Sequence, residues 1–347
     1  MRQLATFALV AVFATLPSFT CATDDLPPSF DEVMSLLTLD PSVKKRALAG
    51  EIVMINPDDS LEKELSTAVV VVIKQPYDEF IDAVKGDRLF QFNKFILDFA
   101  QIEGQPDVSK FQELGYIASE ADEVHALMAA EPGEEFNLSA EELARFQQLR
   151  AETAGLDDAA LIEIVNNVLH TFLAERLRRY QEMGLGGIAS YQRSDEDKSS
   201  PAEELNAATG AMGSMKRFAP KFLSLLENFP DARIEGVEHR FYVFKLNIAG
   251  RPGFILSHRI YFLGTEFALL VERHIYAPHF YNSLQMVAGV IPHEDSSVVF
   301  YGNRTYTDQI TGIGSDMKQS MGGGQLAEEI NALLTDIRAG IESGKAK

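Results

Sequence analysis

Four basic side chains fall on otherwise apolar strand faces in the C-terminal third of this sequence. Side chains two residues apart on a strand share a face. By this alternation, Arg240, His258, Arg273 and Arg304 each lie among Phe, Leu, Ile, Val or Tyr residues. A charged group in such surroundings requires a partner, because an unpaired charge in a low dielectric is costly by several kcal/mol.

Two kinds of partner satisfy these groups. One is internal, and the candidate carboxylates are Asp308, on the strand face of Arg304, and Glu272, beside Arg273. The other is the acidic head of a ligand whose tail lies on Phe and Leu side chains, since a planar guanidinium binds carboxylate or phosphate through two hydrogen bonds. The predicted ligand-binding residues are Arg240, His258, Arg273, Arg304, Tyr306, Asp308 and His279.

The histidines and glycines also fit simpler roles. His258, flanked by aliphatic residues, is typical of a hydrogen-bonded core histidine as well as of a ligand contact. Glu272 and His274 share a strand face, but no third ligand is evident, so no metal site is predicted. Residues 322–324 are three glycines at an expected helix start. They indicate a flexible connection, a hinge, or an anion cradle built from free backbone amides.

The sequence carries no common enzyme signature. It contains no Gly-x-Ser-x-Gly, no His-Glu-x-x-His and no dinucleotide fingerprint after a strand. The single cysteine, Cys21, lies near the N-terminus, so the rest of the chain has no thiol for catalysis, disulfides or metal binding. No catalytic residue, metal or cofactor is therefore predicted.

The first 22 residues predict a cleavable secretory signal. Arg2 precedes an apolar run over residues 4–16 and a small-residue exit, with cleavage expected after Ala22. The run is too short to cross a bilayer, which needs about 20 residues, and no integral membrane segment is expected later in the chain. Lipid attachment at Cys21 is the alternative, but the preceding residues do not match a lipoprotein signal. The expected location is the periplasm or the cell exterior.

Charge limits the partners of the chain. The sequence has 51 acidic and 31 basic residues, a net charge of −20. A field of this sign repels phosphate backbones, so no nucleic-acid partner is expected. After cleavage about 325 residues remain, enough for one large core. We expect a single domain over residues 23–347.

The order of elements changes along the chain. Residues up to 118 predict a short helix opened by Ser29 and Glu32, strands at 51–55 and 68–73, a helix at 77–84, and an apolar segment at 92–102 that fits a strand or a helix. Residues 119–229 predict helices, among them one capped at Ser139, one over 157–181 and one capped at Ser200.

The last segment predicts a meander and a closing helix. Five strands are expected at 238–247, 254–263, 267–276, 283–291 and 297–308, and their short links make them antiparallel. After Gly324 an apolar stripe at helical spacing runs through Leu326, Ile330, Leu333, Ile337 and Ile341.

This succession resembles the START-like (helix-grip) superfamily. The residues that carry the resemblance are Ser257-His258, Tyr276-x-x-His279-x-Tyr281-x-x-Leu284, Asn303-Arg304-x-x-x-Asp308 and Gly312. The C-terminal stretch also resembles a group of uncharacterised secreted bacterial proteins. The resemblance implies an α+β fold in which a curved antiparallel sheet wraps around a long C-terminal helix, here with a helical insert at about 119–229. Members of the superfamily often hold lipids or other apolar molecules between sheet and helix.

The sequence and the resemblance together predict an exported protein that binds an apolar, anionic ligand, such as a fatty acid, phospholipid or isoprenoid. Two alternatives remain open. One is a periplasmic enzyme, a cyclase or hydrolase, that uses His258 or His279 as a general base. The other is an interaction protein of the cell envelope whose helical insert binds an unknown partner chain.

Overall fold

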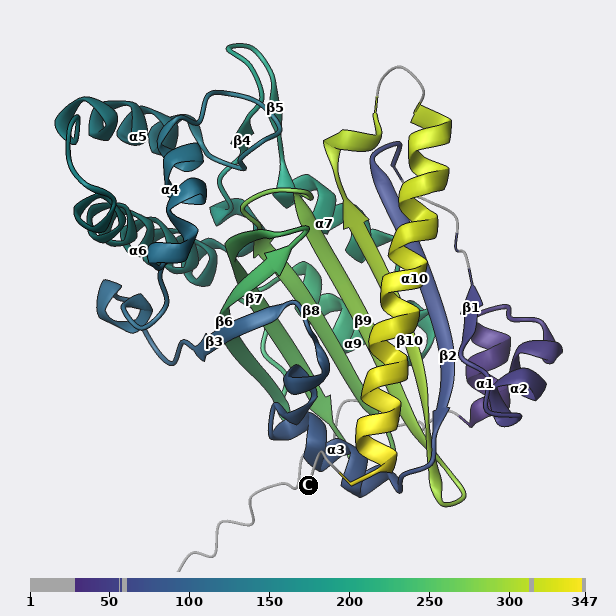
Figure 1. Ribbon diagram of the computed structural model, residues 1–347. Helices are drawn as coiled ribbons and strands as arrows, with labels where there is room; N and C mark the ends of the chain where they lie inside the picture. Colours follow the sequence, from purple (N-terminus) through teal and green to yellow (C-terminus); the bar gives the residue numbers. More distant parts are fainter. Residues whose placement is uncertain (1–28, 56, 58–60, 312–314, 345–347) are drawn as a thin grey trace, which may run out of the picture.

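One large antiparallel sheet organises the molecule (Figure 1). The computed structural model describes residues 29–55, 57, 61–311 and 315–344, so the predicted signal over residues 1–22 and Cys21 lie outside the described residues. The strand order is β1-β2-β10-β9-β8-β7-β6-β3. The strands are β1 Val53–Ile55, β2 Glu64–Ile73, β3 Ile96–Gln101, β6 Val237–Ile248, β7 Arg251–Leu263, β8 Ala268–Tyr276, β9 Ser283–His293 and β10 Ser296–Tyr306. The predicted five-strand meander is confirmed.

Tight turns set the register of this meander. Ala249 and Gly250 join β6 to β7 with φ angles of 51° and 85°, both in the left-handed region. Two such residues match the right-handed twist of the flanking strands. The turn pairs Ile248 with Arg251 and fixes every later pair of β6 and β7.

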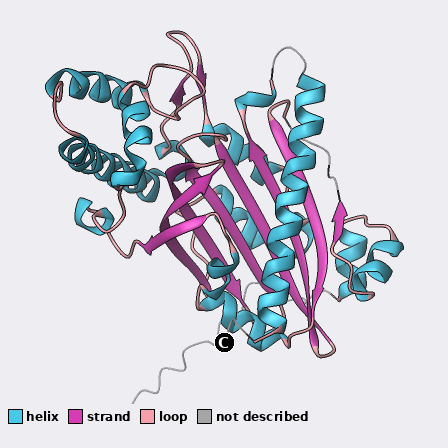
Figure 2. Ribbon diagram, in the orientation of Figure 1, coloured by secondary structure: helices cyan, strands magenta, loops and turns pink. Residues whose placement is uncertain are grey.

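Helices cover both faces of the sheet (Figure 2). They are α1 Phe30–Leu36, α2 Pro41–Leu48, α3 Tyr77–Lys85, α4 Ala121–Met128, α5 Ala140–Glu152, α6 Asp158–Met183, α7 Pro201–Gly210, α8 Met215–Phe218, α9 Pro220–Glu227 and α10 Ser315–Glu342. The predicted caps at Ser29, Ser139 and Ser200 are confirmed, because each hydroxyl accepts the expected backbone N–H. The helix α2 was not predicted.

The two faces of the sheet have different covers. On one face, which we call the α10 face, α10 lies along β2 (Figure 1). There Ile330 and Leu334 pack on Val69 of β2. On the opposite face, α1 and α2 pack on Val298, α8 and α9 pack on Ile260, and α7 contacts β8 and β9. This arrangement confirms the α+β prediction of an antiparallel sheet packed against a long C-terminal helix.

Gly322, Gly323 and Gly324 lie inside α10, so the prediction that they precede the helix is wrong. A Cβ on Gly322 would lie 3.2 Å from Leu65 of β2. Glycine therefore lets the helix approach the sheet closely, and the packing gained there offsets the low helix propensity of glycine.

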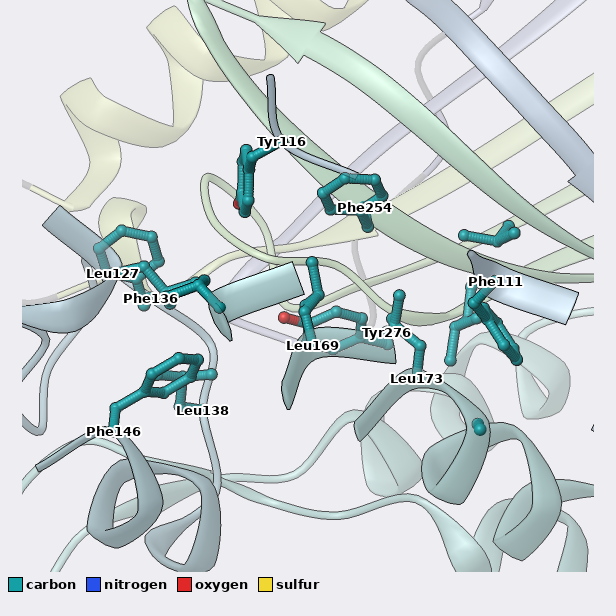
Figure 3. Close-up of a cluster of buried hydrophobic side chains, with 14 of the residues drawn as sticks. Phe111, Tyr116, Leu127, Phe136, Leu138, Phe146, Leu169, Leu173, Phe254 and Tyr276 are labelled. Atoms are coloured by element: carbon teal, nitrogen blue, oxygen red, sulfur yellow. The ribbon is translucent and has the colours of Figure 1, made fainter. Parts of the chain in front are cut away.

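The helical section between β3 and β6 has its own core (Figure 3). Phe146 of α5 and Leu173 of α6 belong to a buried cluster that also includes Phe254 of β7. Two side chains of this section form a buried ion pair, in which Arg176 donates to both oxygens of Glu142 at 2.6 and 2.5 Å. The cavity enclosed by this cluster has a volume of about 10 Å³. Such a space holds one water molecule at most.

Candidate functional site

The sheet register separates the four predicted basic residues. His258 lies opposite Arg273, Arg273 opposite Gln285, and Gln285 opposite Arg304. These three basic residues share the face opposite to α10. Arg240 lies opposite Arg259, on the α10 face.

The four predicted residues therefore do not line one common hollow beside the C-terminal helix. Helices cover both sides of this sheet, so both strand faces are apolar. Alternation alone cannot tell which of two apolar faces meets α10.

Each of the three arginines has partners within the protein. Arg304 donates to the buried carboxylate of Glu64. Arg240 donates to Glu238 at 2.6 Å and to the carbonyl of Lys85 at 2.7 Å.

Arg273 is fully buried, and the acceptors of its hydrogen bonds among the described residues are neutral. They are Gln285 Oε1 at 2.9 Å, Thr209 Oγ1 at 2.8 Å and the carbonyl of Leu226 at 3.0 Å. The predicted carboxylate partners bind elsewhere, because Glu272 pairs with Arg259 and Asp308 with Arg193.

Asp308 belongs to a polar network at one end of the sheet. It accepts hydrogen bonds from Arg193 at 2.8 Å and Asn282 at 3.0 Å, and Lys63 lies 3.5 Å away. Burial raises the pKa of Asp308, but the hydrogen bonds from Ser199 and Arg193 and the charge of Lys63 leave it below its usual value. Tyr306 is buried two residues before it. These partners give Asp308 a structural role.

His258 is the centre of a hydrogen-bonded chain on the face opposite to α10. Its Nδ1 lies 2.8 Å from the hydroxyl of Tyr180, and its Nε2 lies 2.9 Å from Nδ1 of His239. Phe241 stacks on its ring at 4.5 Å between centroids. Burial, His239 and Arg273 hold the pKa of His258 well below its usual value. The imidazole is therefore neutral and fixed in the core.

The hydrogen-bonded chain around His258 depends on a close approach between the C-terminal end of α6 and the backbone of Phe229. Gly184 has a φ of 58°, and a Cβ there would lie 2.0 Å from the carbonyl oxygen of Phe229, whose ring contacts His258. We expect Gly184→Ala to lower the free energy of unfolding by at least about 2 kcal/mol in urea denaturation. Gly186→Ala is the matched control, because Gly186 has no neighbour within 4 Å of the added Cβ. Equal stability of the two variants would contradict this explanation.

A second polar cluster lies on the α10 face, and the sequence indicated only two of its members, Glu272 and His274. Glu272 of β8 accepts hydrogen bonds from Ser257 at 2.7 Å and from Arg259 at 2.6 Å. His274 Nε2 lies 3.2 Å from Glu272, and His274 Nδ1 lies 2.8 Å from the hydroxyl of Tyr281. The sequence signal was present, since Ser257 and Arg259 alternate with the apolar residues of the same strand. We call Ser257, Arg259, Glu272, His274 and Tyr281 the Arg259 cluster.

The Arg259 cluster is set among aromatic rings and is partly open. The guanidinium of Arg259 lies 4.2 Å from the ring centroid of Phe90, in the short helix η1 (Arg88–Phe92). The side chains of Arg259 and His274 are 15% and 14% exposed, although both lie on a covered sheet face. Leu284, directly opposite His274, is half-buried. The side chains of Arg259 and His274, which lie beside apolar residues, are thus partly accessible to solvent.

The geometry of the Arg259 cluster suits holding a polar group better than nucleophilic catalysis. Burial raises the pKa of Glu272, but Arg259 and His274 outweigh burial and leave that pKa far below its usual value. Glu272 is therefore a weak base for the Ser257 hydroxyl, and His274 contacts Glu272 and Tyr281 instead of Ser257. A nucleophile requires a base within hydrogen-bond reach. In the described part of the chain no group of three or more His, Cys, Asp or Glu residues is arranged to hold a metal ion.

The remaining predicted residue, His279, is buried between the sheet and the helical section. Its Nε2 lies 3.9 Å from Glu123 of α4. Burial and the charge of Arg251 lower the pKa of His279 to about 4. His279 thus lies in the loop between β8 and β9, beside α4.

Comparison with protein-family models, with curated proteins and with solved structures finds no match. Among the described helices, none combines the length and the apolar character needed to cross a bilayer.

Proposed function

We propose that this chain is a START-like binding protein that holds an amphiphilic molecule on the α10 face, with the polar head at the Arg259 cluster. The order of elements supports the assignment. The strand β2 is followed by α3 and η1, then by the edge strand β3. The meander β6–β10 is followed by the short helix η5 (Asp308–Ile310) and then by α10. Export, predicted from residues 1–22, would place this binding outside the cytosol.

One observation carries the proposal. On a sheet face otherwise covered by α3, η1 and α10, Arg259 remains partly open beside Phe90, while its partner Glu272 is buried. An internal ion pair that served stability alone gains little from exposure, because water weakens it. A ligand head that excludes this water would strengthen its contacts with the pair.

The charge of the head follows from the state of Arg259. Glu272 already neutralises Arg259, so an anionic head has to compete with an internal carboxylate. The proposed ligand is therefore still anionic, and its head binds Arg259 in competition with Glu272. The hydroxyl of Tyr281, which already shares a hydrogen bond with His274, can form one more with a hydroxyl or carbonyl group of the head.

The experiment measures binding of a fluorescent long-chain fatty acid by the purified protein. We expect saturable binding that Leu284→Trp weakens about tenfold or more, because the larger ring fills the space opposite His274. Leu156→Trp is the matched control, since Leu156 is 47% exposed in the loop before α6. Absence of binding, or equal affinity of the two variants, would refute the proposed site.

A second variant tests the head group. Glu272→Gln removes the competing carboxylate and frees Arg259, so the fluorescent fatty acid should bind about tenfold more tightly. The corresponding fluorescent alcohol should bind with unchanged affinity. If the alcohol gains as much as the acid, the head does not contact Arg259, and this placement of the ligand is wrong.

A further inference from the structure

An open cleft separates the β3 edge of the sheet from the helical section. Its volume is about 770 Å³, within the range of about 300–1,000 Å³ typical of ligand sites. Leu97 and Asp98 of β3 and Lys245 of β6 lie on the sheet side. Residues 113–115, 117, 119, 120, 122 and 123 lie on the other side.

The lining of the cleft is strongly acidic. It contains the five carboxylates of Asp98, Glu113, Glu120, Asp122 and Glu123 and only the two bases Lys245 and Arg251. Lys245 binds Glu120 at 2.6 Å and Arg251 binds Glu123 at 2.8 Å. This leaves three exposed carboxylates that form no ion pair with a described residue: Asp98, Glu113 and Asp122.

Exposed apolar side chains lie on both walls of the cleft. Leu97 on the sheet side is 50% exposed, and Ile117 on the opposite side is 56% exposed. The strand β3 is also an edge of the sheet, paired only with β6 among the described strands. Apolar side chains flanked by like charges at an open sheet edge favour contact with another chain.

We propose that this cleft binds a basic segment of a partner protein, in which lysines or arginines alternate with apolar residues. The two internal pairs show that its carboxylates bind such cations, and the three unpaired carboxylates extend the same pattern along the cleft. A second copy of this chain does not fit, because its net charge of −20 would repel the cleft. The proposal does not depend on the α10 face or on the function proposed there.

The test uses a short fluorescent peptide of alternating lysine and leucine and the intact protein, with fluorescence anisotropy as the readout. The cleft variant is Asp98→Lys/Glu113→Lys/Asp122→Lys. The matched control is Glu328→Lys/Glu329→Lys/Asp336→Lys, which changes the net charge equally at exposed positions of α10. We expect the cleft variant to bind at least about tenfold more weakly than both the wild type and the control.

Two different outcomes would contradict the proposal. Equal losses in the two variants would show attraction to the overall charge alone and would overturn the site. Leu97→Ser/Ile117→Ser should also weaken peptide binding while leaving the binding of spermine unchanged. The opposite result is that spermine displaces the peptide and that Leu97→Ser/Ile117→Ser binds peptide and spermine as tightly as the wild type does. The cleft would then take small polycations, and the proposed protein partner would be wrong.

Discussion

Replacing Arg176 by methionine should lower the free energy of unfolding by about 3–5 kcal/mol, the largest effect that we expect from a single substitution. Arg176 and Glu142 are 7% and 8% exposed, and their bidentate pair joins α6 to α5. The substitution removes the cation and leaves a carboxylate buried without its counter-charge. Urea denaturation followed by circular dichroism measures the change.

Two further variants isolate the cause. Arg178→Met, on the same helix, removes an arginine that is 42% exposed and pairs with Glu182, so it should cost less than about 1 kcal/mol. Arg176→Met/Glu142→Gln removes both charges and should recover part of the loss. If the double variant is as unstable as Arg176→Met, lost packing on the ring of Tyr276 explains the effect instead of the buried charge.

Acid should destabilise the fold between about pH 6.5 and pH 5 through its buried histidines. Burial lowers the pKa of His258, of His239 and of His279, the last to about 4. In the unfolded chain each histidine takes up a proton near pH 6.5, whereas in the folded protein each stays neutral to lower pH. The unfolded state therefore binds more protons, and stability falls as the pH falls.

The expected loss is about 2 kcal/mol between pH 6.5 and pH 5 for each histidine that stays neutral throughout. Glu272 and Asp308, whose pKa values are lowered, lose their contribution only at more acidic pH. Urea denaturation at several pH values measures the slope. His258→Phe should be less stable at pH 7.5, because Tyr180 loses its acceptor, but its loss on acidification should be smaller by one histidine. An unchanged slope would show that His258 does not contribute.

Elements with strong local signals were predictable from the sequence. The strands of the meander have regular alternation and short turns, and their bounds agree with the prediction to within a few residues. The start of α10 was not predictable, because three glycines read as a break. Only the packing against Leu65 shows why a helix persists there.

The kind of residues that form the candidate site was predicted, but their positions were not. A buried arginine beside a carboxylate on an inner strand face was expected, and the structure places such a pair at Arg259 and Glu272. The alternation assigned the residues of each strand correctly to two faces. The choice between those faces depends on which helices pack on each side, and these contacts join residues far apart in the sequence.

The strand order has a consequence for how the molecule assembles. The strands β6 to β10 pair with their neighbours in sequence. The flanking strands, β1 and β2 on one side and β3 on the other, come from earlier in the sequence. On one flank, Ile73 pairs with Ser297, and on the other, Gln101 pairs with Tyr242. Closing such long loops has an entropic cost that local hairpins avoid. The meander can therefore form as a nucleus, and the chain on either side must find it from a distance to complete the sheet.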